Sequence, residues 1–143
     1  MKAIYTIATL GLLAACGAAH AHGDEHAATT VQPRVTLLSN HDMPDVPGKE
    51  ITTITVDYPP GVVEHVHHHD ANAIVYVLEG NIIEGVQGQP EQHLKAGDTF
   101  YEGPNDTHTI GRNASQTEPA RFVVFIVHDK GKPIVLPGAK DGH

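Results

Sequence analysis

Short segments rich in β-branched residues, separated by proline and glycine turns at near-even spacing, run through most of this 143-residue chain. The pattern shows no helical period, and strands of this length and spacing predict an all-β sandwich or barrel. The segments expected to form strands are Arg34–Ser39, Glu50–Tyr58, Glu64–His69, Ala73–Leu78, Ile82–Val86, Gln92–Lys95, Thr99–Glu102, Thr107–Gly111, Arg121–His128 and Lys132–Pro137.

Four histidines lie within five positions directly before an apolar run: His65, His67, His68 and His69. In an extended strand, side chains two positions apart share a face, so His65, His67 and His69 would point one way and His68 the other. Neutral imidazoles on one face can together bind a transition metal, and imidazole ligands suit zinc, copper, iron and nickel. A third ligand from elsewhere in the chain would complete a facial metal site with positions open for water or substrate.

Residues 1–21 have the pattern of an export signal, with Lys2, a short apolar stretch and then small residues. Cleavage after Ala21 would release a periplasmic or secreted protein. The alternative is a lipobox ending at Cys16, which would leave a lipoprotein anchored to a membrane through that residue. A polar arm over residues 22–46 and a tail over 138–143 would flank a domain over 47–137. The net charge of −8 argues against nucleic acid and anionic membrane surfaces as partners.

The stretch from Gly61 to Gly80 resembles the first motif of the cupin superfamily, with His67 and His69 at the expected spacing. The stretch Gly97–His108 resembles the second motif. The overall pattern is similar to small exported bacterial single-domain cupins of the quercetin dioxygenase-like type. This resemblance implies a double-stranded β-helix, the jelly-roll barrel of that family.

The resemblance also implies one divalent transition metal (iron, copper, nickel, manganese or zinc) held by His67, His69 and His108. The acidic ligand of the first motif would fall at Ala73, which cannot bind a metal. Two alternatives follow: a site of three histidines alone, or a replacement carboxylate from Glu102. Glu102 interrupts an apolar segment, and such a charge is seldom buried without a partner. The other interpretation of Glu102 is a position at the barrel mouth, facing solvent.

We therefore expect a metal-dependent, dioxygenase-like oxidoreductase acting on a small organic substrate, with Glu102 as fourth ligand or proton acceptor. The alternative is a non-enzymatic periplasmic protein that binds metal or a small ligand. Because such barrels can pair through an edge strand, Glu50–Tyr58 is a candidate for homodimer formation. His65 and His68 are expected at the surface, and His93 and His128 at the surface or an interface. The alternative for His65 is a position at the barrel mouth or a role as a fourth ligand. The residues expected to wall the pocket are Val75, Val77, Phe100, Phe122 and Val124.

Overall fold

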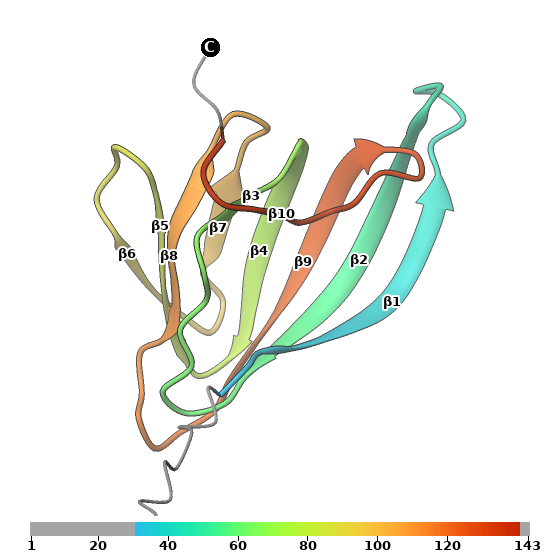
Figure 1. Ribbon diagram of the computed structural model, residues 1–143. Coiled ribbons are helices and arrows are strands. Elements are labelled where there is room, and N and C mark those ends of the chain that lie inside the picture. The colour runs from blue at the N-terminus through green and yellow to red at the C-terminus, as the bar shows by residue number, and fades with distance from the viewer. Residues whose placement is uncertain (1–30, 141–143) are drawn as a thin grey trace, which may run out of the picture.

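The computed structural model describes residues 31–140, which form two antiparallel sheets of five strands facing each other (Figure 1). The prediction of an all-β, double-stranded β-helix is confirmed. The predicted signal peptide (1–21), Cys16 and the first part of the predicted arm lie outside the described residues. Residues 31–140 contain no helix long and apolar enough to cross a membrane.

The first sheet has the strand order β1-β2-β9-β4-β7. Its strands are β1 (Arg34–Asp42), β2 (Lys49–Tyr58), β9 (Ala120–Asp129), β4 (Ala71–Glu79) and β7 (Thr99–Glu102). The second sheet has the order β10-β3-β8-β5-β6. Its strands are β10 (Leu136–Pro137), β3 (His67–His68), β8 (Thr107–Asn113), β5 (Asn81–Val86) and β6 (Gln92–Lys95).

The core lies between the two sheets. Residues along the strands of the first sheet alternate between buried and more exposed, so one face of this sheet is turned toward the core. The alternation is strict along β2 and nearly so along β4, as expected for antiparallel strands that bury one face. The inward residues of the first sheet include Ile54, Val56, Val75, Val77, Phe122, Val124 and Ile126. The sequence of each strand therefore fixes which of its side chains can reach an internal site.

Glu50–Tyr58 forms most of β2 and does not lie at a sheet edge. β1 pairs with β2 from Arg34–Asp57 to Asp42–Glu50, and β9 pairs with the other side of β2. The prediction that this strand is free to pair with a second copy is wrong. The extended segment that begins at Arg34 continues well beyond Ser39 and so covers the whole strand.

His128 is buried, contrary to the prediction of a surface or interface position. It is 3% exposed and points into the space between the sheets. Its Nε2 lies 2.8 Å from Thr52 Oγ1 and 3.6 Å from Glu50 Oε1. These partners come from a different strand, so a polar environment is built there that the sequence around His128 does not reveal. His65 and His93 are exposed and His68 is partly exposed.

Gly80 makes the turn through which the chain passes from β4 in one sheet to β5 in the other. Its φ is +73°, in the left-handed region, and a Cβ atom there would lie 2.5 Å from the carbonyl oxygen of Pro119. Both observations require glycine. The closing glycine of the first motif is therefore a packing requirement of the sheet crossover.

After β9, the chain crosses from the first sheet to the second; we call residues 130–138 the crossing segment (Figure 1). Ile134 packs against the hydrophobic core, and the Gly138 N–H donates a hydrogen bond to the Val66 carbonyl over 2.9 Å. The crossing segment thereby reaches the strand that carries the clustered histidines.

Candidate metal centre

Three histidines converge between the sheets: His67 from β3, His69 directly after it, and His108 from β8. In the register of β3 with β8, His67 lies opposite His108. The ring centroid of His67 is 5.0 Å from that of His69 and 4.6 Å from that of His108. The structure thus brings together all three predicted histidine ligands; His69 and His108 are buried and His67 is partly buried.

Backbone carbonyls orient two of these rings. His67 Nδ1 lies 2.9 Å from the carbonyl oxygen of His65, and His69 Nδ1 contacts the carbonyl oxygen of Ile134. A carbonyl only accepts hydrogen bonds, so each Nδ1 carries the proton. The Nε2 atom of each ring therefore keeps its lone pair, as a metal ligand requires.

Glu102, from β7, points into the same cluster and is 4% exposed. Its Oε2 lies 3.4 Å from His69 Nε2 and 3.5 Å from His108 Nδ1. Glu102 is the direct cross-strand partner of Ala73, the position where the first motif would carry its acid. The interpretation of Glu102 as a solvent-facing residue is wrong. Its role as a replacement ligand stays a prediction, which its position favours.

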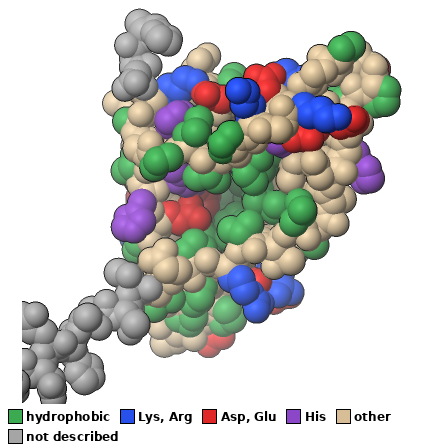
Figure 2. Space-filling model, turned by 45° about the vertical axis from the view of Figure 1, so that its right-hand side comes forward, with side chains coloured by type: hydrophobic (Ala, Val, Ile, Leu, Met, Phe, Trp, Pro, Cys, Tyr) green, Lys and Arg blue, Asp and Glu red, His purple; other side chains and the backbone are tan. Residues whose placement is uncertain are grey.

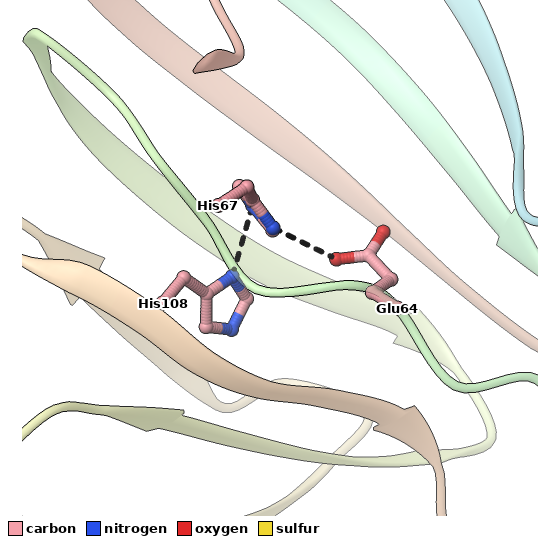
Figure 3. A group of neighbouring side chains, drawn as sticks. All are labelled: Glu64, His67 and His108. Atoms are coloured by element: carbon pink, nitrogen blue, oxygen red, sulfur yellow. Dashed lines mark hydrogen bonds and ion pairs between the residues drawn. The ribbon is translucent and has the colours of Figure 1, made fainter. Parts of the chain in front are cut away.

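Two further carboxylates reach the histidines and were not predicted from the sequence. Glu64 Oε2 lies 3.9 Å from His67 Nδ1 (Figure 3), and Glu84 Oε2 lies 2.5 Å from His108 Nε2. Glu84 interrupts the apolar segment Ile82–Val86, which is the same signal that singled out Glu102. Glu64 lies in the irregular segment before β3, where only its closeness to His67 in sequence could have indicated it.

The histidine and carboxylate side chains border a cavity of about 70 Å³. Figure 2 shows the hollow on this face, with acidic and histidine side chains beside hydrophobic ones. Three of the predicted wall residues line it, whereas Val77 and Phe100 are buried in the core without lining it. The apolar lining consists of Val35, Ile54, Val56, Val75, Phe122, Val124, Ile126 and Val135.

The donor set fits a divalent transition metal. One ligand atom from each of His67, His69 and Glu102 lies within 4.8 Å of the others, and Glu64, His67 and His108 form a second such group. Sets dominated by imidazole nitrogen suit zinc, copper, iron and nickel, whereas calcium and magnesium prefer oxygen ligands throughout. His67 belongs to both groups, which links them through one imidazole.

The carboxylates make this site strongly attractive to positive charge. Burial opposes the charged form of His108, but Glu84, Glu102 and Glu64 offset this and raise the pKa of its imidazole to about 9. Burial raises the pKa of the Glu84 carboxyl to about 7, although His108 acts in the opposite direction. Without a metal, a proton on His108 supplies part of the positive charge that the carboxylates favour.

We expect the metal-free protein to lose stability as the pH rises from 6.5 to about 9. The pKa of His108 is higher in the folded chain than in the unfolded chain, so the folded state binds more protons in this window and stability falls with pH. The raised pKa of Glu84 adds a loss that begins near pH 4.5 and ends near pH 7. For His108 the free energy of unfolding should fall by about 3 kcal/mol in total across this window.

Urea unfolding of the metal-free protein at both ends of this window measures the effect. His108→Gln is the control, because it removes the titrating imidazole and should flatten the upper part of the profile. A free energy of unfolding that increases between pH 6.5 and pH 9 would contradict the expected direction.

Comparisons with known proteins support the fold. The family model described as Cupin domain matches residues 54–126, and curated proteins yield no match to the sequence. An uncharacterized conserved protein with a double-stranded β-helix domain from Klebsiella pneumoniae is 18% identical. The comparison covers 75% of this chain and 86% of that protein, with a TM-score of 0.59.

Two enzymes of solved structure share the fold. An oxalate oxidase in complex with glycolate is 24% identical over 77% of this chain and 57% of that chain, with a TM-score of 0.58. The DMSP lyase DddQ from Ruegeria pomeroyi is 20% identical over 65% of this chain and 45% of that chain, with a TM-score of 0.55. The chain therefore spans about half the length of these two enzymes.

Proposed function

Since this chain belongs to the cupin domain family, we propose that it is a metal-dependent, dioxygenase-like oxidoreductase acting on a small organic molecule. The observation that carries the proposal is the convergence of three imidazoles and the buried carboxylate of Glu102 beside an apolar cavity. The ligands in this proposal are His67, His69, His108 and Glu102. The metal is one divalent ion of iron, copper, nickel, manganese or zinc.

The side chains of the site have distinct roles in this proposal. A bound metal would supply Lewis acidity and electron transfer to a coordinated substrate. Glu102 offsets part of the cation's charge as fourth ligand or, when not bound, accepts a proton from the substrate. Tyr58 lines the same cavity, and its hydroxyl makes no hydrogen bond within residues 31–140. The apolar walls exclude water.

The solved structures favour a small substrate. One similar enzyme is an oxalate oxidase that holds glycolate, and another is a DMSP lyase. These names describe those proteins; for this chain they support a small organic molecule with a polar group that can reach the metal. In the proposal the protein acts in the periplasm or outside the cell, as its leader predicts.

Metal analysis of the purified protein tests the proposal. The full chain is expressed with its leader, purified without a His tag and analysed for metals by mass spectrometry. We expect about one equivalent of a redox metal, the number a single facial site would hold. Oxygen uptake is then screened with small hydroxy acids, keto acids and enols. An absence of bound metal would overturn the proposal. Several weakly held equivalents without turnover would favour a metal-binding or ligand-binding protein.

A further inference from the structure

We propose that Glu84 is a positioning residue that turns His108 so that Nδ1, rather than Nε2, faces the metal. This inference rests on the proposed function, because it concerns the same metal site. It implies a mixed ligand set, with Nε2 offered by His67 and His69 and Nδ1 offered by His108.

The two nitrogen atoms of His108 face different partners. Nδ1 lies 3.1 Å from His67 Nε2 and 3.5 Å from Glu102 Oε2, within the cluster of predicted ligands. Nε2 lies 2.5 Å from Glu84 Oε2, on neighbouring strand β5, which pairs with β8. The ring therefore lies between the metal site on one side and a single carboxylate on the other.

Glu84 has no other partner in the described part of the chain. It is 1% exposed, and neither of its carboxylate oxygens makes a hydrogen bond of suitable geometry within residues 31–140. A buried carboxylate is costly unless it is paired. Its one close polar contact is His108 Nε2, so the position of Glu84 is explained by that ring.

The orientation of His108 is opposite to that of the other two rings. His67 and His69 direct Nδ1 at a backbone carbonyl and leave Nε2 available. The ring of His108 has no backbone carbonyl partner among the hydrogen bonds of the described residues. The Glu84 carboxylate lies at ion-pair distance from Nε2 and favours a proton on that atom, which leaves the lone pair on Nδ1 and raises its basicity as a ligand.

Zinc binding to the protein purified after expression with its leader tests the inference. Zinc affinity is measured by competition with a chelator for the wild type, Glu84→Gln and Glu84→Ala. We expect both variants to lose affinity by about 10-fold to 100-fold, the usual cost of losing such an outer partner. Glu84→Gln should lose less, because its amide oxygen still accepts from Nε2–H. Glu91→Gln is the matched control, since Glu91 is an exposed carboxylate 3.5 Å from another imidazole, that of His93.

Nuclear magnetic resonance of the zinc-loaded wild type supplies a readout that needs no variant. Long-range nitrogen–proton correlations identify the metal-bound nitrogen of each ring, and we expect Nδ1 for His108 and Nε2 for His67 and His69. Zinc bound through His108 Nε2 would overturn the inference alone. So would wild-type zinc affinity in a folded Glu84→Gln protein with unchanged His108 resonances. A wild type that binds no zinc or other divalent metal would overturn the proposed function and this inference with it.

Discussion

Replacing His69 by alanine is expected to abolish specific metal binding. His69 is buried, its Nδ1 is held by a backbone carbonyl and its Nε2 lies 3.4 Å from Glu102 Oε2. The variant loses a direct ligand and leaves that carboxylate without one of its two imidazole partners. The affinity should therefore fall by more than the roughly 100-fold that losing an outer partner can cost.

Thermal unfolding with and without metal provides the measurement. A ligand that binds only the folded state raises the melting temperature, and more so the tighter it binds, so the wild type should be stabilised and His69→Ala should not. His93→Ala is the control, because that imidazole is exposed on β6. Equal metal stabilisation of His69→Ala and the wild type would contradict the assignment of His69 as a ligand.

Replacing Glu102 by alanine is also expected to lower metal affinity strongly, and a carboxylate introduced on the neighbouring strand β4 should restore it. Glu102→Ala removes the carboxylate that lies beside both His69 and His108. Ala73 is the direct partner of Glu102 across β4 and β7 and is 0% exposed. Side chains paired in this way have Cβ atoms about 4.5–5.5 Å apart. Ala73→Glu in the Glu102→Ala background should therefore return a carboxylate to the site and recover most of the lost affinity.

The exchange has a matched control one residue away. Asn72 lies on the outer face of the same strand, where its Oδ1 accepts a hydrogen bond from the Tyr101 hydroxyl over 2.7 Å. Asn72→Glu in the Glu102→Ala background adds the same charge but directs it away from the histidines. Metal titration of the three variants compares the two positions. If Ala73→Glu recovers no more affinity than Asn72→Glu, a carboxylate at this place is not a ligand.

The strands could be predicted because their apolar residues alternate, but the lengths of some could not. The predicted strand Glu64–His69 is reduced to β3, which pairs only at His67 and His68 with β8. Val63 makes a separate bridge to Arg112, and the chain leaves the ladder between these two points. This departure depends on the partner strand, which the local sequence does not describe.

The site was predictable where a single segment carried the signal. The spacing of His67 and His69 indicated two ligands on one face, and a charge within an apolar segment indicated Glu102. Glu84, within the apolar segment Ile82–Val86, carries the same signal. The burial of His128 cannot be predicted from its own segment, because its polar partners Thr52 and Glu50 lie more than 70 positions earlier in the sequence.

The crossing segment, which follows β9, contacts two of the clustered histidines through its backbone. Its Ile134 carbonyl orients His69, and its Gly138 carbonyl lies 3.1 Å from His68 Nδ1. Local opening of this segment would separate β10 from β3 and release the orientation of His69, while the other strands stay paired. Because a metal bound only to the closed form lowers the population of the open form, metal occupancy should slow amide hydrogen exchange across residues 130–138. The geometry of the metal site therefore depends on a segment that contributes no ligand.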